Sequence, residues 1–425
     1  MPTESQLFAE TGPGLPDFYE TLDRPPGDID VHGHDEPLNY RYVGGEVFIR
    51  AQDQDAVLEL LSGDGIDVSS ISEPESMAAL PPPPGPDESP DHGIPAGEAS
   101  ATDRDFGRVR LSLEEPRAVP DAVDSLIAAN FKASPHHVYA TGNHTQFGPA
   151  DAPESISKPM WASNFVEQTA PTGSLAVIID TGLLEKDNTD SFPFKHVLRN
   201  PHDREETRPT PVAGNVPPYV GHGTFVAGRL LQESPKSRIV MVRPENMWET
   251  ADGESLAVKD DDLAMALLRA LGRIGDSKAV VMNMSFSGSA HSGDSLTEFS
   301  NMRMMLDVWL AQGTVLVAAA GNKHSKNEHF PGAWKDVICV GATDSQGATT
   351  DYSNYGSWVD VEVLGDDTQS WHIKDRGGWR IEVPSAAVTT PRRRHYAAGP
   401  WHGYAKWSGT SFAAPYVAGK IASYG

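Results

Sequence analysis

The chain of 425 residues is longer than one ordinary domain, and its 39% of hydrophobic residues is enough for a buried core. Its formal net charge of -25 is concentrated in residues 1–150, which carry 27 acidic and 8 basic side chains, so we expect no nucleic-acid binding. No apolar run approaches the roughly 20 residues that cross a membrane, and the single cysteine, Cys339, excludes an intrachain disulfide.

The first residues, MPTESQ, contain neither the basic cluster nor the apolar segment of a signal peptide. We therefore expect a cytoplasmic protein with no membrane partner, and secretion by another route is the alternative. Because an excess of acidic charge favours partial disorder, we expect residues 1–40 to be a disordered N-terminal segment.

Two short β-α-β patterns follow within residues 41–145. Apolar and polar residues alternate over residues 109–113, which is the two-residue period of a strand. Between the two patterns, residues 73–104 are rich in Pro, Gly, Ser and acidic residues and are expected to form a flexible loop. The predicted elements are strand 45–49, helix 53–61, strand 66–70, strand 109–113, helix 122–131 and strand 137–140. Their order is that of a small α+β, ferredoxin-like unit.

The second domain is predicted over residues 146–425, where strands and helices alternate. The strands are continuous apolar runs, which indicates a mostly parallel sheet covered by helices on both faces, an α/β fold of three layers. Sheets of this kind carry ligand sites at the carboxyl ends of their strands. The predicted strands are 175–179, 239–242, 279–284 and 314–319, and the predicted helices begin at 222 and span 260–274 and 296–312.

Three glycine-flanked segments supply an acid, a base and a nucleophile. Asp180 directly follows the strand at 175–179, His222 lies in GHGT, and Ser411 lies in GTSFAAP at the predicted start of a helix. A serine hydroxyl becomes a useful nucleophile when an imidazole accepts its proton and a carboxylate orients that imidazole. Alone, these residues could be a turn Asp, a loop His and a helix-capping Ser. Their joint occurrence in the order Asp, His, Ser favours the catalytic interpretation.

These segments resemble the subtilisin-like serine proteases, the subtilase or peptidase S8 family, over residues 175–425. The resemblance implies the subtilisin-like fold and a serine endopeptidase that cleaves protein or peptide substrates through an acyl-enzyme, without a cofactor. It assigns Asn322, in the segment AAGN, to the oxyanion hole. It also implies that the substrate backbone pairs with a strand beside the site. The implied walls of the adjacent pocket are Ser285, Phe286 and Ser287 on one side, and Ala320 and Gly321 on the other.

The resemblance further implies that residues 41–145 are similar to the subtilase prodomain, which assists folding and inhibits the protease. An unrelated α+β module is the alternative. The family usually has glycine where Ser287 stands, so a hydroxymethyl group here is expected to crowd the cleft. Residues 366–407 are longer than the corresponding family connection, and their aromatic and basic residues favour a hairpin beside the site that meets the acidic N-terminal region.

Metal sites are not expected. The pairs His32 and His34, and His136 and His137, lack a supporting ligand spacing. The connection over residues 228–239 lacks the Asp- and Asn-rich turn with which many subtilases bind calcium. Two other functions remain open: a dedicated intracellular protease that processes one partner protein, and a catalytically silent binding module on the same fold.

Overall fold

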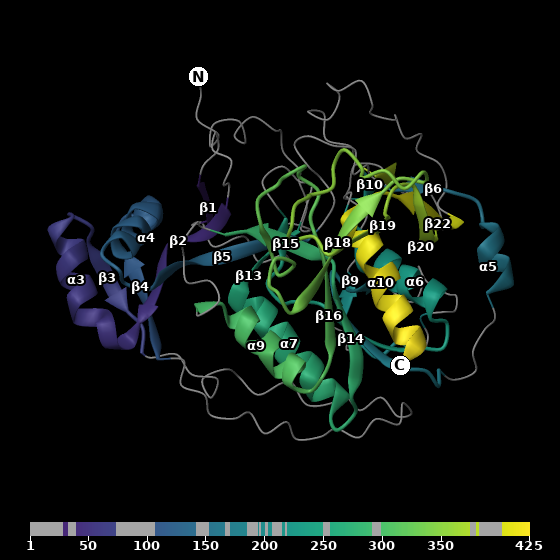
Figure 1. The fold of residues 1–425 in the computed structure, drawn as a ribbon, viewed down its shortest axis with the longest axis horizontal. Helices are drawn as coiled ribbons and strands as arrows, with labels where there is room; N and C mark the ends of the chain where they lie inside the picture. Colours follow the sequence, from purple (N-terminus) through teal and green to yellow (C-terminus); the bar gives the residue numbers. More distant parts are fainter. Residues whose placement is uncertain are drawn as a thin grey trace.

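The computed structural model describes fourteen stretches of the chain (Figure 1): residues 29–32, 40–73, 107–141, 153–165, 171–184, 194, 197–199, 203–205, 215–216, 219–249, 256–290, 299–374, 380–381 and 402–425. The loop predicted over residues 73–104 therefore lies almost entirely outside the described residues. We call the described part up to residue 141 the N-terminal domain, and the part from residue 153 onward the C-terminal domain.

The N-terminal domain is an antiparallel sheet with two helices on one face. Its strands lie in the order β5-β2-β4-β3, and α3 and α4 cover the apolar face. Val47, Ile49, Leu61, Leu111 and Leu126 are fully buried between sheet and helices, as the strand and helix periodicities predict. The elements are β2 (Tyr40–Arg50), η1 (Ala51–Asp53), α3 (Gln54–Gly63), β3 (Val68–Ile71), β4 (Arg108–Leu113), η3 (Pro116–Ala118), α4 (Val119–Ala128) and β5 (Ala133–Thr141).

One short strand differs from the sequence-based expectation. Residues 29–32, within the segment expected to be disordered, form β1 (Ile29–His32), which pairs antiparallel with β2. The pairing extends from Ile29 opposite Val43 to His32 opposite Tyr40. Pairing with β2 gives backbone N–H and C=O groups of this segment hydrogen-bond partners, although its surroundings in the sequence are acidic. Composition alone does not predict such pairing.

The C-terminal domain is built on a six-stranded parallel sheet in the order β11-β7-β14-β16-β18-β19. All five residues of β7 are buried, as expected for a strand covered on both faces. The six strands are β11 (Arg238–Val242), β7 (Leu175–Ile179), β14 (Ala279–Met284), β16 (Val315–Ala319), β18 (Val337–Thr343) and β19 (Val361–Leu364). This parallel sheet confirms the predicted fold class.

Two helices cover each face of this sheet (Figure 1). On one face lie α6 (His222–Glu233) and α10 (Thr410–Tyr424), which pack against each other; on the other lie α7 (Asp260–Ile274) and α9 (Asn301–Ala311). The first turn of α7 carries three aspartates, whose charges are favourable at the positive end of a helix dipole. Both α6 and α10 begin at the carboxyl end of the sheet, with His222 and Ser411 in their first turns.

A second small sheet lies beside α6. Its order is β20-β22-β6, and the antiparallel pairing of β20 with β22 confirms the hairpin predicted within residues 366–407. Arg376 and residues 392–394 lie outside the described residues, so the expected meeting of these basic side chains with the N-terminal region stays a prediction. The three strands are β20 (Thr368–Lys374), β22 (His402–Trp407) and β6 (Glu154–Ser155).

The remaining elements are short, and two of them, β13 and β15, join the two domains. They are α5 (Met160–Asn164), β8 (Leu183–Leu184), β9 (Arg204–Glu205), β10 (Asn215–Val216), β12 (Trp248–Glu249), β13 (Leu256–Lys259), β15 (Phe286–Ser289), β17 (His329–Phe330) and β21 (Arg380–Ile381). Among the described residues, no helix is both long enough and apolar enough to cross a membrane.

One strand belongs to both domains. β5 pairs with β2 from Ala133, opposite Ile49, to Val138, opposite Arg41. Its end pairs antiparallel with two strands of the C-terminal domain, with β13 over Val138 to Thr141 and with β15 at Ala140 and Thr141. The two domains are therefore joined by continuous backbone pairing and not by side-chain contact alone.

Candidate active site

Asp180 and His222 are hydrogen-bonded at the carboxyl end of β7. The distance from His222 Nδ1 to Asp180 Oδ1 is 2.7 Å, and the side chains of both residues are almost completely buried. The same Asp180 oxygen accepts a hydrogen bond of 2.7 Å from the Thr181 backbone N–H. Because an ionised carboxylate can only accept, Nδ1 carries the proton of a neutral ring, and Nε2 keeps its lone pair. His222 Nε2 is buried and has no hydrogen-bond partner among the described residues.

Glycines allow the start of α6 to approach the turn after β7. Gly223 donates a backbone hydrogen bond of 3.0 Å to Thr181 Oγ1. A Cβ atom at Gly223 would lie 2.2 Å from the Gly182 carbonyl oxygen, so any larger residue would push His222 away from Asp180. Gly221, just before the helix, has φ +87°, which side chains disfavour. Gly221 and Gly223, which flank His222 in the sequence, are therefore required by backbone conformation and by close packing.

Ser411 is the second residue of α10. Its Oγ donates a hydrogen bond of 3.2 Å to the Ser285 carbonyl oxygen, and no hydrogen bond joins it to His222. The neighbouring Phe412 ring is 5.3 Å from the His222 ring, centroid to centroid, so the nucleophile candidate and the imidazole come from adjacent helix starts. A serine hydroxyl changes its direction by rotation about one bond, and catalytic hydrogen bonds often form only with substrate present.

Asn322 follows β16, and Thr410 fixes the direction of its amide. Asn322 Oδ1 accepts two hydrogen bonds from Thr410, one from the backbone N–H at 2.9 Å and one from Oγ1 at 2.8 Å. Since a backbone N–H can only donate, the amide oxygen must face Thr410, which directs the NH₂ group away from that residue. Thr410 immediately precedes Ser411, so the amide donor and the hydroxyl are held by neighbouring residues.

The residues expected to line the pocket lie beside Ser411. The Ser285 Oγ donates a hydrogen bond of 2.9 Å to the Ser411 carbonyl oxygen and accepts one of 2.9 Å from Asn283 Nδ2. A Cβ atom built on Gly321 would lie 2.6 Å from Ser287 Oγ, so the two expected walls approach closely at this point. Phe286 is buried and Ala320 is fully buried.

The strand expected to pair with substrate already has a partner. Phe286 lies opposite Thr141, and Ser287 lies opposite Ala140, in antiparallel pairing between β15 and β5. The Tyr139 side chain of β5 packs over Gly288, where an added Cβ would lie 2.8 Å from the ring. Tyr139 is 1% exposed and belongs to the core of the C-terminal domain. The sequence indicated neither this pairing nor the role of Tyr139 in it.

Two residues of the β20–β22 hairpin also lie beside His222. The ring of Trp407 is 5.8 Å from the His222 ring in an edge-on arrangement. A Cβ atom at Gly221 would lie 2.6 Å from His372 Nε2. Burial lowers the pKa of His372 to about 3, although a hydrogen bond to the Val220 backbone opposes this, so the ring is neutral at physiological pH. The tryptophan content of residues 366–407 pointed to this hairpin, whereas no sequence signal indicated His372.

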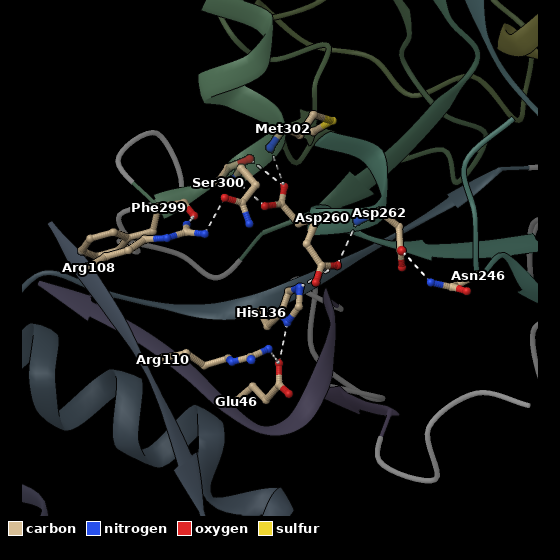
Figure 2. Close-up of polar contacts among 12 residues, drawn as sticks. Glu46, Arg108, Arg110, His136, Asn246, Asp260, Asp262, Phe299, Ser300 and Met302 are labelled. Atoms are coloured by element: carbon tan, nitrogen blue, oxygen red, sulfur yellow. Dashed lines mark hydrogen bonds and ion pairs between the residues drawn. The ribbon is translucent and has the colours of Figure 1, made fainter. Parts of the chain in front are cut away.

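A polar cluster connects the domains near the start of α7 (Figure 2). His136 of β5 lies between Glu46 of β2 and Asp261 of α7. Arg108 of β4 donates hydrogen bonds to the Phe299 carbonyl oxygen and to Asn301 at the start of α9, and its guanidinium lies 4.3 Å from the centre of the Phe48 ring. His136 and Arg108 of the N-terminal domain thus bind polar groups of the C-terminal domain at two helix starts.

Asp260 organises the beginning of α9 in the same cluster. Its carboxylate accepts hydrogen bonds from Ser300 Oγ at 2.7 Å and from the backbone N–H groups of Asn301 and Met302. Burial raises the pKa of Asp260, while the Ser300 hydrogen bond acts in the opposite direction. Among the described residues, no group of three or more His, Cys, Asp or Glu side chains has a geometry suitable for a metal ion.

Comparison with known proteins identifies the family. The model of the subtilase family matches residues 172–424. The thermophilic serine proteinase of Bacillus sp. (strain AK1) is 31% identical over 211 residues, which is 47% of this chain and 41% of that protein. Thermitase of Thermoactinomyces vulgaris is 27% identical over 258 residues, which is 58% of this chain and 73% of thermitase.

A third relative is a protease with a named processing role. The nisin leader peptide-processing serine protease NisP of Lactococcus lactis subsp. lactis is 26% identical over 302 residues, 59% of this chain and 40% of NisP. The chain thus spans less than half the length of two of the three relatives. The family match covers more than half of the chain and includes Asp180, His222, Asn322 and Ser411. The chain belongs to the subtilase family.

Proposed function

We propose that the protein is a serine endopeptidase in which Ser411 is the nucleophile, His222 the general base and Asp180 the residue that orients His222. The observation that carries the proposal is the Asp180–His222 hydrogen bond of 2.7 Å. It fixes the tautomer in which Nε2, the nitrogen that must take a proton, has a free lone pair. Family membership and the proximity of Ser411 on the adjacent helix support the same assignment.

In the proposed reaction the Ser411 hydroxyl turns from Ser285 to His222 Nε2 and attacks the carbonyl carbon of the scissile peptide. His222 accepts the proton, and Asp180 stabilises the resulting imidazolium. The Asn322 NH₂ group, turned away from Thr410, donates to the oxygen on which negative charge develops. His222 then protonates the leaving amine, and a water molecule activated by the same imidazole hydrolyses the acyl-enzyme.

We also propose that the N-terminal domain inhibits this site within the same chain and assists its folding. The support is the position of β5 between β13 and β15, where its backbone takes the pairing that an extended substrate would need. The burial of Tyr139 against Gly288 and the contacts of His136 and Arg108 stabilise the same association. Because β5 is paired on both edges, a substrate strand could enter only after β5 has left.

A dedicated processing protease that acts on one partner protein is the second candidate. It is favoured by the similarity to NisP, a leader peptide-processing protease, and by the long segment over residues 366–407, which places Trp407 and His372 beside His222. Turnover of casein separates the two candidates. A general endopeptidase degrades casein into many fragments, whereas a dedicated enzyme leaves it intact while still reacting with a serine-directed probe.

The direct test of the proposed activity is labelling with a biotinylated fluorophosphonate, followed by mass spectrometry of the labelled peptide. We expect one modified residue, Ser411, and no labelling of Ser411→Ala. Ser408→Ala is the matched control, since Ser408 is a buried serine three residues away whose hydroxyl accepts the Asp367 backbone N–H. Lack of labelling over many hours both in the folded wild-type chain and in Tyr139→Ala, whose β5 is expected to bind less tightly, would support the catalytically silent binding module instead.

A further inference from the structure

Asn354, in the segment between β18 and β19, is bonded to the loop that carries Asn322. The Asn354 side chain is fully buried. Its Oδ1 accepts hydrogen bonds of 2.9 Å from the backbone N–H groups of both Lys323 and Ser325, and its Nδ2 donates one of 2.8 Å to the Ala320 carbonyl oxygen. Its own backbone N–H donates to the Gly321 carbonyl oxygen at 2.9 Å.

These hydrogen bonds enclose Asn322 from both directions along the chain. Two of them end on the residues just before it, Ala320 and Gly321, and two end on Lys323 and Ser325 just after it. The Asn322 side chain is held separately, through Oδ1, by Thr410. Thr410 therefore sets the direction of the amide group, while Asn354 sets the position of the backbone from which that amide projects.

Only a primary amide suits this position. The site presents two N–H donors and one carbonyl acceptor to a single side chain, and an asparagine offers the matching oxygen and NH₂ group. An aspartate would place a carboxylate oxygen against the Ala320 carbonyl, and an apolar side chain would leave the buried Ala320 carbonyl and the partly buried N–H groups of Lys323 and Ser325 without this partner. The fit is also close, because a Cβ atom at Gly321 would lie 2.6 Å from Asn354 Nδ2.

We propose that Asn354 is a positioning residue for the oxyanion donor: it holds residues 320–325 so that the Asn322 NH₂ group stays directed at the reacting carbonyl. The inference rests on the proposed peptidase function. A transition-state donor is effective only when it is fixed before the charge develops, and small displacements remove much of its effect. The neighbouring Ser353 serves β18 instead, accepting the Ala342 backbone N–H, so the bonding to residues 320–325 is particular to Asn354.

The test is a double-mutant cycle on the full chain with a chromogenic peptide substrate. We expect Asn322→Ala to lower kcat by about 10²–10³-fold. Asn354→Ala should lower kcat by about 10–100-fold while KM changes less than about threefold. If Asn354 acts through Asn322, then adding Asn354→Ala to Asn322→Ala should change kcat by less than about threefold. All variants keep the same N-terminal domain, so inhibition by it cancels in the ratios.

The matched control is Thr314→Val at the opposite end of β16. Thr314 is also buried and donates one hydrogen bond of 2.9 Å to the Ala279 carbonyl oxygen, far from residues 320–325. We expect this variant to melt at a lower temperature with an unchanged kcat. Asn354→Ser, which can restore one of the three side-chain bonds, serves if Asn354→Ala does not fold, and it should show the same coupling to Asn322.

Two results would overturn the proposal. In the first, the effects of the Asn322 and Asn354 substitutions on kcat multiply, as they would for two independent residues. In the second, Asn354→Ala lowers the melting temperature as Thr314→Val does and leaves kcat unchanged. A normal kcat for Asn322→Ala would instead contradict the proposed role of Asn322 and is therefore distinguishable from a failure of the Asn354 inference.

Discussion

His136 of the N-terminal domain lies with its Nε2 atom 3.4 Å from Oδ1 of Asp261 in the C-terminal domain. Its other ring nitrogen, Nδ1, is 2.6 Å from Glu46 Oε2. A neutral imidazole has one N–H and one lone pair, and a lone pair directed at a carboxylate is unfavourable. Both nitrogens are therefore best satisfied when the ring is an imidazolium. Burial opposes that charge, yet Asp261 and Glu46 together raise the pKa of His136 to about 9.

This arrangement predicts that alkaline pH weakens the contact between the domains. A histidine pKa raised from 6.5 to about 9 contributes stability that is complete below about pH 6.5 and is lost as the pH rises through 9. Between pH 7 and pH 10 the free energy of unfolding should fall in both proteins. We expect the fall in the wild type to exceed that in His136→Gln by up to about 3 kcal/mol. Urea unfolding of both full-length proteins at several pH values measures this difference.

The other charged groups around His136 do not produce the same pH dependence. Asp261 has a pKa that burial tends to raise but that His136 lowers overall, so it stays ionised above pH 7. Burial and the neighbouring Asp261 raise the pKa of Asp262 to about 6, and it therefore titrates below the window and in both proteins. Arg110, Lys259 and the buried Asp260 also face the cluster and are present in both proteins. Parallel stability curves from pH 7 to 10 would contradict the prediction.

Ser411→Ala is expected to abolish peptide hydrolysis and to leave the fold intact, because the hydroxyl makes one hydrogen bond of 3.2 Å and fills little space. The double variant Ser411→Ala with His222→Ala should be no less active than Ser411→Ala alone, since residues that act as a unit have strongly non-additive effects. Initial rates on a peptide substrate and the melting temperature give both values. A further large loss on adding His222→Ala would mean that the two side chains act independently.

Ser287→Gly is expected to widen the pocket for the residue before the scissile bond. The Ser287 hydroxyl lies 2.6 Å from the position of a Cβ at Gly321, so its removal separates the two expected walls. We predict a change in the ratio of kcat/KM for substrates with Phe or Leu at that position to kcat/KM for substrates with Ala there. In Ser287→Gly this ratio should be about tenfold higher than in wild type, which is the effect of one or two methylene groups in an apolar pocket. Ser289→Ala, at the other end of β15, should leave the ratio unchanged. An equal ratio in all three proteins would place this specificity elsewhere.

Tyr139→Ala is expected to weaken the association of β5 with the C-terminal domain. The ring is 1% exposed and packs over Gly288, and truncation of a buried aromatic side chain costs about 3–5 kcal/mol. We predict faster labelling of Ser411 by a fluorophosphonate in Tyr139→Ala than in wild type. Tyr139→Phe, which keeps the ring, should behave nearly as wild type. Equal labelling rates in all three would show that β5 does not restrict access to Ser411.

Patterns within a short stretch of sequence were sufficient to predict the strands and helices whose formation depends on neighbouring residues. The apolar run at β7, the helix α7 and the strand β14 occur at the predicted residues because a fully buried parallel strand and an amphipathic helix have distinct periodicities. Asp180 and His222 were predicted to act together, and they are hydrogen-bonded. That prediction came from the motifs and the resemblance, whereas the distance between the two side chains depends on the packing of α6.

Features that depend on contacts between distant segments were not predictable. The pairing of Ala140 with Ser287 requires the N-terminal domain to dock, and no pattern in β5 specifies its partner on the second edge. The sequence also indicates no partner for His136, because the two carboxylates that flank it are 90 and 125 positions away in the sequence. The role of Asn354 was missed for the same reason, since an asparagine in a turn usually bonds to its own neighbourhood.

The membership of β5 in two sheets has a consequence for hydrogen exchange. Amides of residues 139–141 pair with β13 and β15, beyond the end of the β2 pairing at Val138, so their protection ends when the strand leaves the C-terminal domain. Amides near Ala133 are paired with β2 inside the N-terminal domain and open only when that domain unfolds. One continuous strand therefore spans two cooperative units of different stability. Exchange measured along β5 gives the free energy of opening the cleft at one end and of unfolding the N-terminal domain at the other.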